Sequence, residues 1–334
     1  MVRRNLVVIG GSAGAVEAVA YLLGELPEDF PGYLLVVLHL AATSKPEWLR
    51  AMFAKRCRLP VETPADEQAL EPGRVYVARP DHHLLVKKDR VLANRGPREN
   101  LWRPAIDVLF RSAAVAYDSR VIGVLLSGEL DDGTSGLQAI NACGGVTVVQ
   151  NPDDALHPAM LQTALANVRV DHCPTLRELL TLLIRLVQEP APSGVSVPES
   201  LRKEVRLIEV PQDAPQIMAE RGSPVALSCP ECSGPLWREG SDRAHFRCMV
   251  GHGFHLNTLA DGSDDELDRT LWAAIRMFEQ RVNISRMLGE QEHMRGRAQR
   301  AQLYESRARE SQRYAQTLRE LHQRRRLVLD ESDE

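Results

Sequence analysis

The stretch NLVVIGGSAGA at residues 5–15 carries the clearest indication of the fold of this chain. Its first half is a short run of β-branched and apolar residues, which is typical of a buried strand, and a turn of glycine and serine follows it. The next residues carry an apolar pattern with helical spacing, through Ala18, Val19, Leu22 and Leu23. A second apolar run, LLVVLHL, lies at 34–40. Strand, helix and strand in this order predict a βαβ unit, in which the two strands are parallel.

The same alternation continues to about residue 188 and predicts a doubly wound α/β domain over residues 1–188. We expect helices near 106–117, 137–142 and 175–187, and strands at 121–126 and 146–149. Short alternating segments separated by Pro and Gly occupy residues 60–95, and they predict an inserted hairpin region over the main sheet. These segments are VYVA, HLLVKK and RVLANR. The predicted fold class is therefore α/β with a mostly parallel sheet.

Three further segments follow the α/β domain. Residues 189–224 begin with EPAPSGVSVPES, which is rich in Pro and Ser, and we expect them to form a linker. A small module that contains three cysteines is expected over residues 225–260. Residues 264–326 carry apolar side chains at helical spacing, from Leu267 to Met287, and predict a long helix or coiled coil.

The composition is that of an ordinary globular protein and excludes several classes. Of the 334 residues, 44% are hydrophobic and 26% are charged, and the formal net charge of −4 favours no polyanionic partner such as nucleic acid. The apolar runs are too short to span a bilayer, so we expect no membrane insertion. Cys57, Cys143 and Cys173 are isolated, whereas the other three cysteines lie close together beside a histidine. This cysteine usage is typical of a reducing compartment and predicts a cytoplasmic protein.

Three reactive side chains follow three of the predicted strands. Ser12 follows the first strand, His39 ends the second, and Asp132 lies in the loop after the strand at 121–126. In an open parallel sheet, ligands bind beyond the carboxyl ends of the strands. A serine nucleophile needs a base that accepts its proton and a carboxylate that orients this base. We therefore predict a serine hydrolase with Ser12, His39 and Asp132 as its catalytic residues.

Other interpretations of these residues remain open at this point. GGSAG fits the G-x-S-x-G pattern of a nucleophile turn, but the order serine, histidine, aspartate differs from that of the α/β-hydrolases and requires another sheet topology. A glycine-rich turn after a strand is also typical of dinucleotide-binding domains, although Ser12 and Ala15 replace two of the expected glycines. His39 alone is compatible with a core histidine, and Asp132 alone is compatible with a turn.

Together these residues resemble the catalytic domain of the bacterial chemotaxis protein-glutamate methylesterases, the CheB family, over about residues 5–187. The similar motifs are, in order, VVIGGSAGAVEA, VVLHL, PDHHLLV, RPAIDVLFRSAA, LLSGELDDGTSGL and NPDDALHPAM. The resemblance implies that the chain hydrolyses glutamyl methyl esters on chemoreceptors or receptor-like proteins and releases methanol; some members also deamidate glutamine. It also implies Ser12 as the nucleophile, His39 as the general base, and Asp132, rather than Asp131, as the triad aspartate.

The resemblance implies further site residues, and the chain departs from the family at some of them. Oxyanion and substrate contacts are implied for Ala13, Gly128, Glu129 and Met160. The family usually has threonine where this chain has Ala13, methionine where it has Glu129, and proline where it has Leu161. A carboxylate of Glu129 that points inward would oppose a developing negative charge. Typical members begin with a receiver domain, but here the first catalytic strand is expected near residue 5, so we expect no receiver domain.

The cysteine module has the donor spacing of a metal site. Cys229-Pro-Glu-Cys232, fifteen intervening residues, and Cys248-Met-Val-Gly-His252 offer three thiolates and one imidazole. This donor set is suited to tetrahedral zinc. Four protein ligands leave no open position, so we expect the zinc to be structural and expect no cofactor for catalysis.

Two other histidines compete for the fourth ligand position. His245 and His255 lie close in sequence, and we expect both to be solvated if His252 is the ligand. A metal-free module with free thiols is the alternative to a zinc site. The segments CPEC, LW and FRCMVGH resemble the zinc-ribbon tails that some methylesterase-like proteins carry.

The predicted C-terminal helix offers a surface for protein partners. The apolar stripe of residues 264–326 favours self-association or docking to a partner protein, and the scarcity of stacking aromatics argues against nucleic acid. The leading hypothesis is a protein-glutamate methylesterase whose partner is a methylated chemoreceptor or receptor-like protein. The alternative is a catalytically weak signalling scaffold that uses the esterase fold for binding.

Overall fold

The computed structural model describes residues 2–40, 43–45, 47–210, 216–217, 222–239 and 245–330. The chain divides into two compact units, Met1–Leu259 and Ala260–Glu334. The first unit contains the α/β domain and the cysteine module, and the second contains most of two long helices. None of the helices in the described residues combines the length and the apolar composition that a membrane span requires.

A six-stranded sheet forms the centre of the first unit. Its strands follow the order β3-β5-β2-β1-β8-β9, and each neighbouring pair is parallel. The strands are β1 (Leu6–Gly11), β2 (Tyr33–Leu38), β3 (Val61–Glu62), β5 (Arg74–Val77), β8 (Val121–Leu125) and β9 (Val146–Val149). Within the sheet, β2 pairs with one edge of β1, and β8 pairs with the other edge of β1. Because the strand order reverses there, the carboxyl ends of β1 and β8 are the expected place for a ligand site.

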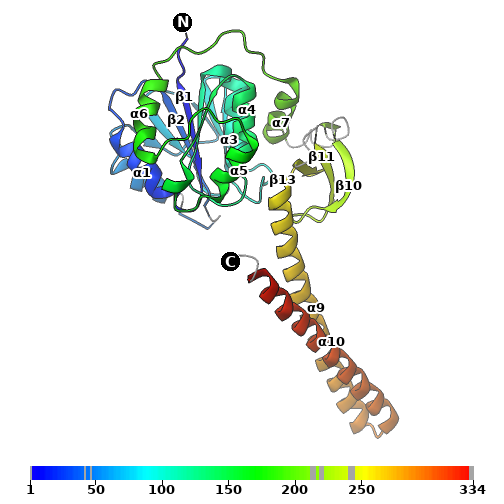
Figure 1. Cartoon of the computed structure of the whole chain (residues 1–334). Helices are drawn as coiled ribbons and strands as arrows, with labels where there is room; N and C mark the ends of the chain where they lie inside the picture. The colour runs from blue at the N-terminus through cyan, green and yellow to red at the C-terminus, as the bar shows by residue number, and fades with distance from the viewer. Residues whose placement is uncertain are drawn as a thin grey trace. The chain divides into compact units, whose positions relative to one another are not determined.

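Helices cover both faces of the sheet, which confirms the predicted α/β class with a mostly parallel sheet (Figure 1). Val7 and Ile9 of β1 pack toward one face, and Leu6 and Val8 pack toward the other. This alternation buries every residue of the strand, as expected when helices lie on both faces. One face carries α1 (Ala15–Glu25), α2 (Glu47–Ala54) and α6 (Leu176–Leu186); the other carries α3 (Ile106–Tyr117), α4 (Thr134–Ala142) and α5 (Ala159–Asn167). The 3-10 helices η1 (Asp118–Arg120) and η2 (Pro152–Asp154) lie in the connections.

The region at 60–95 differs in part from its prediction. The segments HLLVKK and RVLANR form the hairpin of β6 (His83–Lys87) and β7 (Arg90–Asn94), and β4 (Glu67–Ala69) adds a third antiparallel strand. The segment VYVA does not belong to this hairpin, because β5 pairs in parallel with β2 inside the main sheet. All three apolar residues of β5 are buried, which suits an interior strand better than a hairpin over the sheet.

The segment that was expected to be a linker, residues 189–224, contains the helix α7 (Glu199–Glu209). Leu201, Val205 and Ile208 lie on one side of this helix and are buried, and α7 packs against α3. Their spacing of four and three residues is a helical signal in the sequence. The Pro-rich start of the segment obscured this signal.

The cysteine module is a four-stranded antiparallel sheet in the first unit. Its strands are β10 (Gly222–Ser228), β11 (Pro235–Glu239), β12 (His245–Cys248) and β13 (Gly253–His255), in this order. Among the residues of the module that the structure describes, the core cluster has six buried members, and two of them are cysteines. An apolar core of this size does not support a domain without additional cross-links or a metal.

The segment 264–326 forms parts of two helices rather than one continuous helix. They are α9 (Leu256–Met294) and α10 (Ala298–Asp330), with a turn between them at residues 295–297. The two helices run back along each other: the rings of Phe278 and Tyr314 lie 5.3 Å apart, and His322 Nε2 lies 2.6 Å from Asp268 Oδ1. Arg286 also donates to Gln312 at 3.1 Å. The pattern of the sequence predicted the helical state, but not the turn near Gly296.

Candidate active site and metal centre

Ser12 lies directly after β1, in the turn that leads into α1. Its N–H donates to the carbonyl of Ser127 at 2.9 Å, and its carbonyl accepts from the N–H of Ala15 at 3.1 Å. Gly14 has a φ of 75°, a left-handed conformation that glycine adopts without a steric penalty. A Cβ at residue 14 would also lie 2.9 Å from the side chain of Leu156. The turn therefore holds the Ser12 backbone from both sides at the carboxyl edge of the sheet.

His39 follows β2, the neighbour of β1, and its ring contacts two of the other predicted residues. Nδ1 lies 3.1 Å from Ser12 Oγ, and Nε2 lies 2.7 Å from Asp132 Oδ2. An ionised carboxylate only accepts hydrogen bonds, so Nε2 carries the hydrogen and Nδ1 presents its lone pair to the Ser12 hydroxyl. The side chains of His39 and Asp132 are each 2% exposed, so water does not compete for this bond.

Asp132 belongs to the loop after β8, and its carboxylate lies at the N-terminus of α3, which stabilises its negative charge. Oδ2 accepts from the N–H of Ile106 at 2.7 Å, and Oδ1 accepts from the N–H of Asp107 at 3.1 Å. The N-cap residue, Ala105, has no side chain that could satisfy these N–H groups. Burial alone would raise the pKa of Asp132, but the hydrogen bond and charge of His39 and the two helix N–H groups lower it below its ordinary value. Asp132 is therefore an anion at neutral pH.

The neighbouring Asp131 has a different environment. It is buried and accepts a hydrogen bond from the hydroxyl of Thr258, at the start of α9. Burial is the largest cause of its raised pKa, which the charge of His255 and the Thr258 hydrogen bond offset only in part. Asp132, and not Asp131, is the carboxylate that contacts the imidazole of His39.

Gly128, one of the predicted substrate-side residues, lies against both Ser12 and Met160, another of these residues. A Cβ at residue 128 would lie 2.4 Å from Met160 Cε and 2.9 Å from Ser12 Cβ, so only glycine fits there. The N–H of Gly128 donates to the carbonyl of His157 at 2.9 Å, and its carbonyl accepts from the N–H of Met160 at 3.0 Å. The Gly128 amide is therefore engaged within the protein, and this residue supplies space rather than a donor.

Ala13 and Glu129 keep their backbone donors available. Among the described residues, no protein acceptor receives a hydrogen bond from either N–H group. The Glu129 carboxylate lies 3.2 Å from His157 Nδ1, and its side chain is 66% exposed. It is therefore paired with a histidine at the surface, which weakens the expectation that it opposes a negative charge on the substrate.

Three residues around this group were not predicted from the sequence. Trp102 stacks on the ring of His39, with ring centroids 4.3 Å apart and planes inclined by 8°. Asn100 donates through Nδ2 to Asp132 Oδ1 and to Asp107 Oδ2, at 3.0 Å each. Asp107 Oδ1 in turn accepts from backbone N–H groups of the loop that carries Asp132 and of α4. For Asn100 and Trp102 no signal was present in the sequence; Asp107 could have been noticed as an acidic residue in the first turn of the helix predicted near 106–117.

Known proteins share this fold and these motifs. Residues 7–183 match the CheB methylesterase family. The chain belongs to the CheB methylesterase family. A relative from Leptospira interrogans, named a putative protein-glutamate methylesterase/protein-glutamine glutaminase, is 38% identical over 183 residues, which are 54% of this chain and 94% of the relative. A protein-glutamate methylesterase/protein-glutamine glutaminase from Myxococcus xanthus is 35% identical over 190 residues, which are 55% of this chain and 54% of the relative.

A solved structure supports the same assignment. The CheB methylesterase catalytic domain of Thermotoga maritima is similar to this chain with a TM-score of 0.53 and 27% sequence identity. The similarity covers 56% of this chain and all of that structure. The predicted resemblance to the CheB catalytic domain is thus confirmed for residues 7–183, and the segments that follow lie outside this match.

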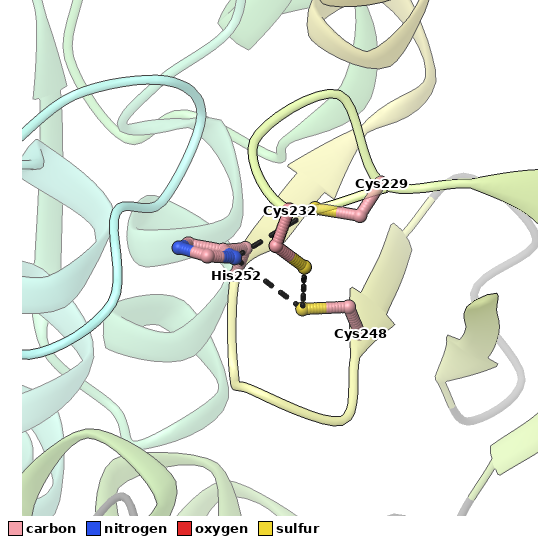
Figure 2. A group of neighbouring side chains, drawn as sticks. All are labelled: Cys229, Cys232, Cys248 and His252. Carbon is pink, nitrogen blue, oxygen red and sulfur yellow. Dashed lines mark hydrogen bonds between the residues drawn. The ribbon is translucent and has the colours of Figure 1, made fainter. Parts of the chain in front are cut away.

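The cysteine module of this CheB-family chain brings its four predicted ligands together (Figure 2). The ligand atoms of Cys229, Cys232, Cys248 and His252 all lie within 4.8 Å of one another. His252 Nδ1 lies 3.7 Å from Cys229 Sγ and 3.4 Å from Cys248 Sγ, and the two sulfurs of Cys232 and Cys248 are 3.8 Å apart. Zn–S bonds of about 2.3 Å and a Zn–N bond of about 2.0 Å in a tetrahedron give S···S edges of about 3.8 Å and S···N edges of about 3.5 Å. The three distances of 3.4–3.8 Å agree with these edges, so the cluster is compatible with a tetrahedral zinc ion.

The other two histidines of the module are buried, contrary to the expectation that they are solvated. His245 is 6% exposed, and its Nδ1 lies 2.6 Å from Glu239 Oε2. His255 is 7% exposed, and its Nε2 lies 3.3 Å from Asp107 Oδ2. Burial alone would lower the pKa of His255, but the hydrogen bond and the charge of Asp107 raise it to about 9. Spacing in the sequence favoured His252 over these histidines as the fourth ligand, but it carried no information about their charged partners.

Proposed function

We propose that this chain is a protein-glutamate methylesterase that hydrolyses glutamyl methyl esters on methylated chemoreceptors or receptor-like proteins. The observation that supports this most directly is the continuous contact from Ser12 Oγ through the His39 ring to Asp132. Membership of the CheB methylesterase family agrees with it. Two relatives are also named protein-glutamine glutaminases, and the same machinery suits an amide of glutamine, so deamidation is part of the proposal.

The proposed reaction begins with proton transfer from Ser12 to His39. Nδ1 of His39 accepts the hydroxyl proton while Ser12 Oγ attacks the ester carbonyl, and Asp132 stabilises the imidazolium that forms. The N–H groups of Ala13 and Glu129 would donate to the oxyanion of the tetrahedral intermediate. His39 then returns the proton to the leaving methoxide, and methanol departs. Water then gives a proton to Nδ1 as it attacks the acyl-enzyme. His39 returns this proton to Ser12 Oγ as the bond between Oγ and the acyl carbon breaks, so that glutamate and free Ser12 result.

The test is methanol release from methylated receptor fragments. We expect Ser12→Ala and His39→Ala each to abolish release above background, because each removes a group that the first step needs. Ser193→Ala, in an exposed segment far along the chain, serves as the matched control and should release methanol at the unchanged rate. Circular dichroism of all variants checks that the fold is retained. An unchanged rate in Ser12→Ala, or no release by the intact protein from several receptors, would instead support a scaffold that uses the fold for binding.

We also propose that the cysteine module holds one structural zinc ion. Three thiolates and one imidazole fit the donor preference of zinc, and four protein ligands leave no position for a substrate. The hydrogen bond from Cys229 and the neighbouring His252 lower the pKa of the Cys248 thiol below its ordinary value, which favours the thiolate that a metal ion requires. Zinc would supply a cross-link for a module whose described part has a small apolar core. All six cysteines of the chain are unpaired, which suits the cytoplasm as the compartment of this protein.

Finally, we propose that the second unit mediates self-association. In the hairpin of α9 and α10, several large apolar side chains are exposed, and Ile284 (56%) and Met287 (68%) lie one turn apart on α9. Two helices alone bury little apolar surface, whereas a second copy of the hairpin would cover these residues in a four-helix bundle. Ile284→Glu is expected to shift the protein toward monomer in light scattering. The exposed polar site Gln291→Glu is the control, and an unchanged mass in Ile284→Glu would contradict the proposal.

A further inference from the structure

One loop of the α/β domain contacts two members of the Ser-His-Asp group, His39 and Asp132. This loop, residues 98–103, connects β7 with α3, and we call it the 98–103 loop. Asn100 is fully buried, and its amide donates to Asp132 Oδ1 at 3.0 Å. Two residues later, Trp102 stacks on the ring of His39. The orientation of both the base and its carboxylate therefore depends on where this loop lies.

The cysteine module pairs with the 98–103 loop through β13. The N–H of Gly253 donates to the carbonyl of Arg98 at 3.3 Å, and the N–H of Asn100 donates to the carbonyl of Gly253 at 2.8 Å. The loop thus continues the sheet of the module as a short parallel bridge at Glu99. The N–H of His255 donates to Asn100 Oδ1 at 3.1 Å. This bond fixes the side-chain amide of Asn100 so that its NH₂ group faces the carboxylates.

Buried charges join the same two parts. Glu99, in the loop, is 1% exposed and accepts a hydrogen bond from Arg111 of α3. Arg247 of β12 lies 3.5 Å from the other oxygen of Glu99 and 3.1 Å from Glu239 of β11. A buried carboxylate between two guanidinium groups is held firmly, because loss of any member leaves an uncompensated charge. The loop is therefore bound to the module by backbone, amide and ionic contacts.

The metal ligands lie next to these contacts in the chain. His252 directly precedes Gly253, the first residue of β13, and Cys248 is the last residue of β12. The N–H of Cys248 donates to the carbonyl of His252 at 3.0 Å, which closes the turn between the two strands. A metal ion bound to both residues would fix this turn and, with it, the position of Gly253. Without the metal, the small core of the module would have to hold β13 alone.

We propose that Asn100 is a positioning residue for Asp132 and that the metal-bound cysteine module holds Asn100 in place, so that metal occupancy sets the fraction of molecules with a productive Ser-His-Asp group. This proposal rests on the proposed methylesterase function. It assigns the module a role in the activity of the α/β domain, through the contact of Gly253 and His255 with Asn100. The side chain of Asn100 touches no reacting atom and acts only through Asp132.

The first experiment replaces Asn100 with glycine. Asn100 has a φ of 50°, so Asn100→Gly retains the left-handed backbone and removes only the amide. Loss of a hydrogen bond to a charged group predicts a fall in kcat of about tenfold to a hundredfold, with KM unchanged, because substrate contacts remain. Asn167→Gly is the matched control: its exposed amide bonds only to the carbonyl of Thr163, and kcat should not change. An Asn100→Gly protein with kcat within twofold of the unaltered protein overturns the positioning role.

The second experiment tests the module in the full-length chain and does not depend on activity alone. Cys232→Ser removes an exposed ligand, and Cys173→Ser removes an exposed cysteine outside the cluster as its control. Bound zinc, kcat, and hydrogen exchange of the peptide 98–107 are measured on each. We expect Cys232→Ser to lose zinc, to exchange faster in that peptide, and to lose kcat at unchanged KM, while Cys173→Ser matches the unaltered protein.

Two outcomes would overturn the proposal, and neither is confused with failure of the proposed function. If the unaltered protein binds no zinc, the metal dependence is wrong. If Cys232→Ser lacks zinc but keeps both its kcat and the protection of peptide 98–107, the module does not position Asn100. If the unaltered protein releases no methanol, the methylesterase proposal fails, but hydrogen exchange still reports whether zinc orders the loop.

Discussion

Asp132→Asn is the substitution whose effect the structure specifies most closely. Each oxygen of Asp132 accepts from two donors: Oδ2 from His39 Nε2 and the N–H of Ile106, and Oδ1 from Asn100 and the N–H of Asp107. An asparagine has one acceptor oxygen and one NH₂ group. Two of the four donors around residue 132 would therefore face the NH₂ group, which is itself a donor. If the NH₂ group faces His39, the ring must carry its hydrogen on Nδ1 to offer Nε2 as an acceptor. Nδ1 then has no lone pair for the proton of Ser12.

The expected loss follows from this change of tautomer. In Ser-His-Asp enzymes the same exchange lowers kcat by about 10⁴, which corresponds to about 5.5 kcal/mol of transition-state stabilisation. We expect a fall of about 10³ to 10⁴ with little change in KM, since Asp132 has no substrate contact to lose. Each buried donor left unpaired costs about 1–3 kcal/mol of folding stability as well. The pKa of Asp132 is lower in the folded protein than in the unfolded protein. The carboxylate therefore stabilises the fold at pH values above its pKa in the unfolded protein, and this stabilisation disappears as the pH falls through its pKa in the folded protein. The variant lacks this contribution at neutral pH.

The assay is methanol release from a methylated receptor fragment at saturating substrate, with unfolding in urea measured in parallel. Asp131→Asn is the matched control, because Asp131 is buried beside Asp132 but bonds to Thr258 and not to His39. We expect this control to keep kcat within about threefold, since an amide oxygen still accepts the Thr258 hydroxyl. The assignment of the two carboxylates is wrong if Asp132→Asn keeps more than a tenth of the kcat of the unaltered protein. It is also wrong if kcat falls as far in Asp131→Asn as in Asp132→Asn.

Three further predictions concern activity, stability and pH. Gly128→Ala is expected to lower kcat at least tenfold, because its Cβ would lie 2.4 Å from Met160 Cε and displace the turn that carries Ser12. Gly24→Ala is the control in the same methanol assay, because a Cβ at residue 24 would be at ordinary contact distance from its neighbours. Glu99→Gln is expected to lower the free energy of unfolding in urea by about 3–5 kcal/mol, because two buried guanidinium groups lose their common anion, and a loss below about 1 kcal/mol would contradict this. The pKa of His255 is raised to about 9, so its ion pair stabilises the fold fully below pH 6.5 and is lost as the pH rises through 9; the unfolding temperature should fall over this range, and less so in His255→Gln.

The three catalytic candidates could be predicted because their positions follow from local pattern and topology. A strand, a turn and a helix are readable from residues 5–15, and parallel strands bring their carboxyl ends to one edge of a sheet. Ser12, His39 and Asp132 each follow one of three neighbouring strands, β1, β2 and β8. Once the sheet was predicted, their proximity needed no further information. The proximity of the four candidate metal ligands could be predicted for a similar reason, since their spacing is fixed within a short segment.

The contacts that Asn100, Trp102 and His255 make around the site could not be predicted, because none of these residues lies at the end of a strand of the main sheet. The place of Asn100 depends on a bridge to Gly253, which is more than 150 positions away in the chain. Such a contact leaves no periodicity and no spacing in the sequence. The helix α7 is a different case: its apolar spacing was present at Leu201, Val205 and Ile208, but the Pro-rich residues before it favoured a linker.

The orientation of the His39 ring has a chemical consequence for reagents that label this site. Nε2 is bonded to a buried carboxylate, and only Nδ1 faces the nucleophile. In the usual arrangement of such a triad, Nε2 faces the serine and Nδ1 the aspartate. A haloketone that reaches Ser12 as a substrate analogue would therefore alkylate the nitrogen nearer the backbone. The alkylated histidine would be the Nδ1 isomer, which peptide mapping by mass spectrometry against synthetic standards distinguishes from the Nε2 isomer.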